Sequence, residues 1–487
     1  MLCISKTLQK LLSLEKEIKI IVFTEPSICE ATGLRNLLSS NGYTVCEYND
    51  VESFRVTFEE RIKPNIEKTT VIVSTEIYVP YDIRRVFHEV YLSARTLFPN
   101  LNADTVMSHV NDWDIISFAL AQSYSDFTQA KETERFIQDI VFSIGVIEQY
   151  CRSSTDKLLS ACDEAINYQD WINIANRKAS VEYYAAMKNV DVDLSFADEA
   201  FQRFISDGYA RLSSEVNSHS PPIVTKVLSV ILADKNEKSA LIVMDGMSLF
   251  DFKAISRHFR GIQYEHGCSY ALIPTTTPIS RQSLLSCKYP RELSKPFSLA
   301  DEEKEFRATV VSFGFSPTQV DFLRGYDNEI SPLSKLIAIV INDVDGIVHG
   351  QRQGRAGMFN DMDLLGRSGK LQSLIKRLAA LGFAVYITAD HGNTLCTGVG
   401  GFRSGVEVES RSMRMAILKD FAEANTLLAE NATEYQGFYL DKEYRYYICK
   451  NGVSFDNKGE VVMTHGGMSI DEVVIPFIRI RSVKENG

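Results

Sequence analysis

Aspartates and histidines that could bind metal ions are the most informative residues of this sequence. They occur at Asp245, in the run DVDGIVH (343–349), at the pair Asp390-His391 and at His465. Carboxylate oxygens and imidazole nitrogens together suit Zn²⁺ or Mn²⁺, and the absence of Cys from these positions is typical of a catalytic rather than a structural metal site. Each motif alone is weak, since an Asp-Gly pair is often a turn. The chain has only 8 His, so three of them in these motifs form a stronger signal together.

A threonine-rich segment, PTTTPISRQSLLS (274–286), could supply the nucleophile of such a site. Two divalent ions about 4 Å apart can bind the attacking and leaving oxygens of an in-line phosphoryl displacement. A threonine hydroxyl is inert at neutral pH unless its pKa is lowered, which a metal ion can do. The other interpretation of the segment is a polar loop that caps the following helix. The neighbouring metal-binding motifs favour the catalytic interpretation.

Apolar runs lead directly into the metal-binding motifs. SALIVM (239–244), KLIAIVIN (335–342) and FAVYITA (383–389) each end at an Asp, and MRMAILK (413–419) and VVIPFIRI (473–480) are two further runs of this kind. Near-continuous apolar runs are typical of central strands that are covered on both faces. In doubly wound α/β sheets, ligands bind beyond the carboxyl ends of the strands. We therefore predict a doubly wound α/β domain with its site at that edge of the sheet.

The residues before this domain divide into two parts. Strand-like runs such as IKIIVF (18–23) and YTVCEY (43–48) alternate with helical segments over residues 1–97, which predicts a small Rossmann-like α/β domain. No glycine-rich phosphate loop follows its first strand, which argues against dinucleotide binding. Residues 98–220 show helical periodicity and are predicted to form a connecting helical domain. The catalytic domain is then expected to span residues 221–487.

Composition restricts the class of protein and its surroundings. Of the 487 residues, 45% are hydrophobic and 24% are charged, as in globular proteins in solution, and no apolar run reaches the roughly 18 to 20 residues that span a bilayer. Nine scattered cysteines indicate a reducing cytoplasm rather than a disulfide framework. The net charge of -11 argues against a protein that coats DNA through surplus Lys and Arg. A nucleic-acid substrate stays open, because a metal site supplies its own positive charge.

The ordered motifs resemble those of a known family. DGMS, PTTTPISRQSLLS, DVDGIVHG, TADHGN and THGGMSIDEVVIPF are similar to motifs of the alkaline phosphatase superfamily, and most closely to the PglZ domain of BREX-type phage-defence systems. The resemblance covers about half of the chain. It implies an alkaline-phosphatase-like α/β fold, two divalent metal ions and a threonine nucleophile. Zn²⁺ is the expected metal, with Mn²⁺ or Mg²⁺ as alternatives.

The resemblance also implies a role for each residue. One metal ion would be held by Asp245, Thr277, Asp390 and His391. The other would be held by Asp345, His349 and His465. The family's spacing of four between this Asp and His favours Asp345 over Asp343, and its P-T-x-T pattern selects Thr277 over Thr276 as the nucleophile. Cys287 stands where the family often has Gly and could narrow the entrance to the nucleophile helix.

Arg281 is a candidate for binding a phosphate oxygen, because a guanidinium matches phosphate geometry with two hydrogen bonds. A salt bridge within the fold is the other interpretation. Monoesterases usually place extra cationic or amide groups on the third free oxygen, and beyond Arg281 and Asn393 no such set can be identified. A phosphodiester, such as nucleic acid or a cyclic nucleotide, is therefore the preferred substrate.

The expected function is metal-dependent hydrolysis of this phosphoric ester in a bacterial defence system, with other defence proteins as partners and no membrane. Three alternatives stay open. The site could be a phosphomonoesterase, or a mutase or phosphonate-cleaving enzyme with the same ligands. The chain could also be a catalytically silent scaffold that recruits partners through its helical part.

Overall fold

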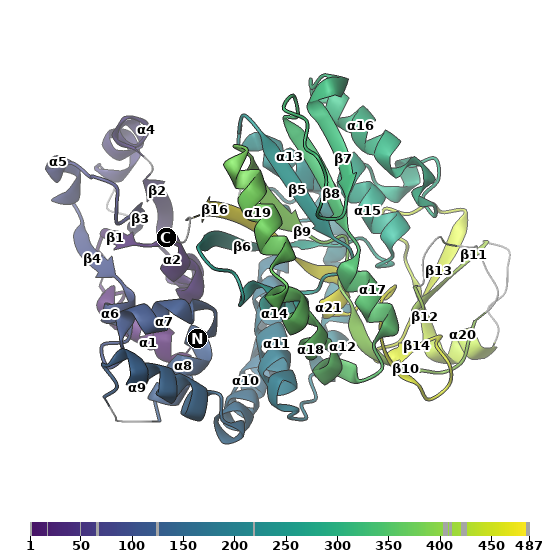
Figure 1. The fold of residues 1–487 in the computed structure, drawn as a ribbon, viewed down its shortest axis with the longest axis horizontal. Helices are drawn as coiled ribbons and strands as arrows, with labels where there is room; N and C mark the ends of the chain where they lie inside the picture. The colour runs from purple at the N-terminus through teal and green to yellow at the C-terminus, as the bar shows by residue number, and fades with distance from the viewer. Residues whose placement is uncertain are drawn as a thin grey trace. The chain divides into compact units, whose positions relative to one another are not determined.

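The computed structural model of the protein describes residues 2–16, 18–48, 50–64, 68–122, 126–217, 220–402, 408, 412–419 and 426–483. They form two compact units (Figure 1). One comprises Met1–Tyr150 with Gln263–Glu265, and the other comprises Cys151–Ile262 with His266–Gly487. The predicted domain limits at 97/98 and 220/221 stay predictions. Among the described helices, none is long and apolar enough to cross a membrane.

The N-terminal unit contains the expected parallel sheet. Its strands are β1 (Ile20–Thr24), β2 (Thr44–Tyr48), β3 (Thr69–Ser74) and β4 (His88–Leu92), in the order β2-β3-β1-β4 with every pairing parallel. β1 is central and buried along its whole length. The helices are α1 (Leu2–Leu11), α2 (Pro26–Thr32), α3 (Leu34–Ser40), α4 (Val51–Thr57), α5 (Tyr81–Arg84), α6 (Ala94–Leu97), α7 (Ala103–Ser108), α8 (Trp113–Leu120) and α9 (Ala130–Arg135).

The predicted helical region is also present. Its long helices are α10 (Ile144–Glu164), α11 (Tyr168–Lys188) and α12 (Ser195–Asp207). α11 begins at Asn167, whose side chain accepts hydrogen bonds from the backbone of Gln169 and Asp170, and it ends at Asn189 in the left-handed conformation. Helices α14 (Leu249–Ser256) and α18 (Gly354–Arg367) pack against α11 (Figure 1). α11 is thus a packing layer of the C-terminal unit.

A six-stranded sheet forms the centre of the C-terminal unit and confirms the α/β class. The strands are β5 (Ser239–Met244), β6 (Ile262–Tyr270), β7 (Val320–Arg324), β8 (Leu336–Ile341), β9 (Ala384–Thr388) and β16 (Val474–Val483). Their order is β6-β16-β9-β5-β8-β7. β7, β8, β5 and β9 are parallel, but β16 runs antiparallel to β9, so the sheet is mixed. The other helices are α13 (Val227–Ala233), α15 (Thr277–Ser286), α16 (Glu302–Ser312), α17 (Asp343–Gly350), α19 (Lys370–Ala380), α20 (Thr426–Asn431) and α21 (Ile470–Val473).

The expectation that the run 413–419 forms a strand of this sheet is wrong. Strand β11 (Met415–Lys419) lies in a separate antiparallel sheet with β13 (Tyr444–Cys449) and β12 (Ala432–Tyr435). Its residues Ala416 and Leu418 pack into a small apolar cluster of their own. A short apolar run therefore predicted a strand correctly but not the sheet it joins. A third sheet contains β10 (Thr394–Gly398), β14 (Val453–Ser454) and β15 (Val461–Thr464).

The register of the central strands brings the metal-binding motifs to one edge of the main sheet. β5 lies between β8 and β9, with Met244 opposite Ile341 and Val243 opposite Thr388. All three strands are parallel, so their carboxyl ends meet at the same edge. The Asp motifs that follow them are neighbours in space for this reason.

Buried charges connect α11 and α12 to the loops at this edge. Lys178 of α11 is 2% exposed and lies 2.6 Å from Asp471 and 2.7 Å from Glu182, and Asp198 of α12 lies 3.8 Å away. Burial alone would lower the pKa of Lys178, but these carboxylates outweigh it and raise the pKa. Arg355 of α18 also lies 2.6 Å from Asp471. Four helices, α11, α12, α18 and α21, are thus joined by one set of ion pairs.

Replacing Lys178 by Met should destabilise the C-terminal unit by about 3 to 5 kcal/mol, because three largely buried carboxylates would lose their contact with the ammonium group, and the Arg355 guanidinium would remain as the partner of Asp471. The exposed pair Lys63–Glu59 provides the control, and Lys63→Met should change the free energy of unfolding by about 1 kcal/mol or less. Urea denaturation of both variants measures the difference. Equal stability of the two variants would contradict this account of the ion pairs.

Candidate metal centre

A first cluster of ligand atoms lies at the carboxyl ends of β5 and β9. One ligand atom each from Asp245, Asp390 and His391 lies within 4.8 Å of the others, and all three residues are buried. Thr277 is the first residue of α15, and its Oγ1 lies 3.1 Å from His391 Nε2 and 3.5 Å from Asp245 Oδ1. Asp390 Oδ1 accepts hydrogen bonds from the backbone N–H groups of Gly246 and His391, while its buried Oδ2 has no hydrogen-bond partner. The predicted first ligand set is therefore together in space.

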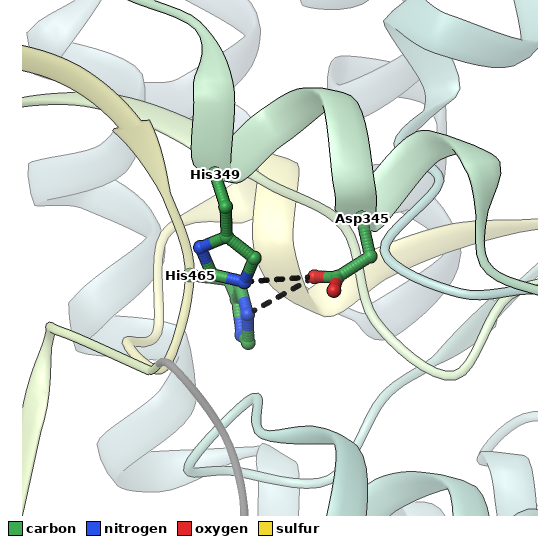
Figure 2. Close-up of side chains that lie close together, drawn as sticks. All are labelled: Asp345, His349 and His465. Atoms are coloured by element: carbon green, nitrogen blue, oxygen red, sulfur yellow. Dashed lines mark ion pairs between the residues drawn. The ribbon is translucent and has the colours of Figure 1, made fainter.

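A second cluster is formed by Asp345, His349 and His465 (Figure 2). Asp345 and His349 lie one turn apart on α17, and His465 follows β15. Asp345 Oδ1 lies 3.1 Å from His349 Nε2 and 3.4 Å from His465 Nε2. The Asp345 side chain is 23% exposed and that of His465 only 1%. Asp345 is thus more exposed than His465.

Backbone contacts fix which nitrogen of each buried imidazole faces the centre. His465 Nδ1 lies 3.0 Å from the carbonyl oxygen of Thr275, and His391 Nδ1 lies 2.9 Å from that of Gly392. A carbonyl oxygen only accepts, so Nδ1 carries a proton in both rings, and Nε2 is the nitrogen that faces the ligand clusters. The two rings are stacked with centroids 4.2 Å apart. The clusters are therefore adjacent, and their Nε2 atoms are suited to bind metal.

The electrostatics of the first cluster favour a bound cation. Burial, together with the neighbouring Asp245 carboxylate, raises the pKa of Asp390 well above its usual range. Burial and the nearby His465 lower the pKa of His391 to about 3, so this imidazole is neutral at neutral pH. A divalent ion would offset the repulsion between the two carboxylates and use the lone pair of His391.

In the second cluster, burial alone would raise the pKa of Asp345, but the nearby imidazoles of His349 and His465 outweigh this effect and lower it. Asp345 Oδ1 and His465 Nε2 are buried atoms without a hydrogen-bond partner, as is Asp390 Oδ2 in the first cluster. Carboxylate oxygens and imidazole nitrogens are the donors that Zn²⁺ and Mn²⁺ take. The residues present fit two divalent ions.

The sequence left a choice between Thr276 and Thr277 and between Asp343 and Asp345, and the two residues of each pair have different contacts. Thr276 accepts a hydrogen bond from Ser412 Oγ at 2.7 Å, whereas Thr277 faces Asp245 and His391. Asp343 is the first residue of α17, and its charge acts on Tyr326, whose pKa is raised by burial and by this carboxylate. Asp345, two residues further along the helix, points to the histidines instead. The geometry supports Thr277 and Asp345.

Arg281 lies behind the first cluster. It is on α15, one turn after Thr277, with its side chain 2% exposed. Its Nη1 donates to Asp245 Oδ2 at 2.6 Å, and its Nε donates to Glu302 Oε1 at 2.5 Å. Arg281 therefore forms salt bridges within the fold, as expected from the alternative to a phosphate contact. A contact with phosphate stays a prediction.

The expectation that Cys287 narrows the entrance to the nucleophile helix is wrong. Cys287 is the C-cap of α15, at the opposite end of the helix from Thr277. Its φ of 56° places it in the left-handed region, which Gly adopts without strain. Backbone conformation therefore explains why a glycine suits this position.

Sequence reasoning missed several residues that hold the ligands. Thr275 supplies the carbonyl oxygen for His465, and its hydroxyl donates to the carbonyl oxygen of Gly467. Glu472 accepts hydrogen bonds from the backbone of Gly467 and Ser469. Its position three residues after Ser469 is a capping-box signal that could have been read. Glu302 carried no such signal, because only the fold brings it to Arg281.

A close backbone approach fixes the loop after β9. The backbone N–H of Gly392 donates to the carbonyl oxygen of Glu472 at 2.9 Å. A Cβ at position 392 would lie 2.0 Å from the carbonyl oxygen of Asp471. Gly is therefore required for α21 to lie against the loop that carries Asp390 and His391.

Comparisons with known proteins agree with the motifs. Residues 224–480 match the family model described as the BREX system PglZ alkaline phosphatase-like domain. This segment includes every residue of the two clusters. A search of curated protein sequences finds no match.

Solved structures of low sequence identity are also similar. Murine ectonucleotide pyrophosphatase/phosphodiesterase 5 is 12% identical, with 50% of this chain and 87% of that chain covered and a TM-score of 0.34. Its human counterpart is 11% identical over 50% of this chain and 87% of that chain, with a TM-score of 0.33. Phosphonoacetate hydrolase from Sinorhizobium meliloti 1021, in complex with phosphonoformate, is 13% identical, with coverages of 52% and 92% and a TM-score of 0.29.

The wild-type protein should bind two divalent ions per chain, and substitutions in the two clusters should each remove one. Asp390→Asn takes a ligand from the first cluster and Asp345→Asn from the second. Elemental analysis after dialysis against Zn²⁺ measures the stoichiometry. Asp207→Asn, at an exposed position, should leave two ions bound. Two ions retained by both cluster variants would contradict the ligand assignment.

Proposed function

The chain belongs to the BREX-system family of PglZ alkaline phosphatase-like domains, and on this premise we propose that it hydrolyses phosphoric esters at a centre of two divalent metal ions. The position of the Thr277 hydroxyl is the main support for this proposal. Its hydroxyl lies 3.1 Å from His391 Nε2 at the buried edge of one ligand cluster, and the second cluster lies beside it. A hydroxyl in contact with the ligands of such a centre is suited to attack a phosphorus atom bound there.

Each of the two ions would have its own set of protein ligands. Asp245, Thr277, Asp390 and His391 would hold one ion, and Asp345, His349 and His465 would hold the other, with Zn²⁺ favoured by the three imidazoles. The chemistry that such ions supply when bound is positive charge, which lowers the pKa of the Thr277 hydroxyl and stabilises the phosphoryl oxygens. Carboxylates and imidazoles of this chain would hold that charge in place.

Thr277 is the proposed nucleophile. Its Oγ1 forms a bond to phosphorus as the ester oxygen leaves, and its proton is released. Water then hydrolyses the resulting phosphothreonine ester and restores the hydroxyl. Thr277 begins α15, which has ten residues, so the positive end of the helix dipole faces the phosphate that reacts there. The helix thus both positions the hydroxyl and favours an anionic substrate.

A phosphodiester is the proposed substrate class, and the contacts of Arg281 and Asn393 support it. Asn393 Nδ2 donates to the carbonyl oxygen of Gly246 and to Asp251 Oδ2, and the Arg281 guanidinium donates to Asp245 and Glu302. Both candidates for binding the third free oxygen of a monoester are therefore engaged within the fold. A nucleic acid or a cyclic nucleotide offers the two-oxygen phosphate that fits. Membership of a BREX family supports other defence proteins as partners.

Replacing Thr277 by Ala should reduce hydrolysis of bis-p-nitrophenyl phosphate by about 10³-fold or more, because the nucleophile is lost. The Asp345, His349 and His465 cluster should keep its ion in this variant. Thr276→Val serves as the matched control and should keep activity within about tenfold, since its hydroxyl accepts a hydrogen bond from Ser412. Initial rates are measured with Zn²⁺ or Mn²⁺ for this diester and for p-nitrophenyl phosphate.

Each outcome of this assay has a definite meaning. Faster turnover of the diester than of the monoester would support the substrate class, and the reverse order would contradict it. Full activity of Thr277→Ala would contradict the nucleophile. A wild-type protein that binds both ions but hydrolyses neither compound would favour a scaffold in a defence complex.

A further inference from the structure

Glu302 is a buried charge close to the candidate metal centre. It is the first residue of α16 and only 1% exposed. Its Oε1 accepts a hydrogen bond from Arg281 Nε at 2.5 Å, and its Oε2 accepts one from Arg324 Nη2 at 2.6 Å. A buried carboxylate loses much hydration energy, so it persists where strong partners compensate it. Glu302 therefore depends on Arg281, and Arg281 on Glu302.

Arg281 connects Glu302 to the first ligand cluster. Its Nη1 lies 2.6 Å from Asp245 Oδ2 and 4.0 Å from Asp390 Oδ2. The Oδ2 atom of Asp245 is thus engaged by the guanidinium, while its Oδ1 lies 3.5 Å from the Thr277 hydroxyl. Fixing one oxygen of a carboxylate orients the other, as is common for residues that support metal ligands.

Glu302 also changes the net charge beside Asp245 and Asp390, through its ion pair with Arg281. A guanidinium alone beside Asp245 would compete with a divalent ion for the same carboxylates. The Glu302 carboxylate, which also pairs with Arg324, offsets part of the guanidinium charge from the other side, so the charges of Asp245 and Asp390 stay more available to the metal ion. Such an effect is strong at a buried site, where solvent screens charges little.

We propose that Arg281 and Glu302 are positioning residues of the metal centre. Arg281 holds Asp245 as a ligand through Oδ1 alone, and Glu302 sets the orientation and compensates the charge of the guanidinium. The inference rests on the proposed two-metal function. It assigns the pair to the first cluster, because Asp345 of the second cluster is paired with His349 and His465 instead.

The test is Zn²⁺ binding by the full chain, measured by competition with a chelator of known affinity. Glu302→Gln keeps the shape of the side chain and removes its charge. We expect the affinity of one of the two sites to fall by about tenfold or more and that of the other to stay within about twofold. Glu303→Gln is the matched control on the next residue, which is 53% exposed and pairs with Arg307, and it should bind both ions as the wild type does.

A double variant separates positioning from a general structural role. On an Arg281→Met background, Glu302→Gln should cause no further loss of affinity, because Glu302 acts through the guanidinium. An additional tenfold loss on that background would overturn this mechanism. If Glu302→Gln does not fold, Arg324→Met tests the same carboxylate from its half-exposed side, with an expected loss of about threefold at the same site.

Metal binding by the wild-type protein tests the two-metal function, and metal binding by the Glu302→Gln variant tests the role of Glu302. A wild-type protein that binds fewer than two ions would contradict the two-metal function itself. A wild-type protein with two bound ions, and a folded Glu302→Gln variant with unchanged affinities or with equal losses at both sites, would overturn the positioning role alone. Circular dichroism establishes that the variants are folded.

Discussion

Asp245 and Asp390 follow neighbouring strands and are buried side by side, and this arrangement determines most of what surrounds them. Two desolvated carboxylates repel each other, so each oxygen needs a donor or a cation. Arg281 donates a hydrogen bond to one oxygen of Asp245. The backbone N–H groups of Gly246 and His391 donate to one oxygen of Asp390. The remaining oxygens face Thr277 and the imidazole of His391. A divalent ion in that space would supply the positive charge that one guanidinium, itself shared with Glu302, does not.

The strands that carry these aspartates were the part of the fold that the sequence predicted best. The runs before Asp245 and Asp390 are apolar on both faces because β5 and β9 lie inside the sheet, and such runs are directly readable. The run at 413–419 looked the same but forms β11 of a separate small sheet, because a short apolar run does not encode its partners. The antiparallel direction of β16 is likewise set by the path of the chain and not by its residue types.

The metal ligands were predictable where the motif itself fixes the geometry. Asp345 and His349 are four residues apart, which on a helix places them on one face. Glu302, Thr275 and Lys178 were not predicted, because their roles depend on contacts between segments that are distant in the sequence. Lys178 lies outside the matched segment 224–480, yet it is paired with Asp471, the neighbour of Glu472. The support of the centre thus extends into the helices that precede the family domain.

Two metal ions should bind side by side beside Thr277, and anomalous diffraction at the zinc edge from crystals soaked in Zn²⁺ would locate them. We expect two anomalous peaks about 4 Å apart. One peak should touch Asp245, Asp390, His391 and Thr277, and the other should touch Asp345, His349 and His465. A single peak, or two peaks away from these residues, would contradict a two-metal centre at this site.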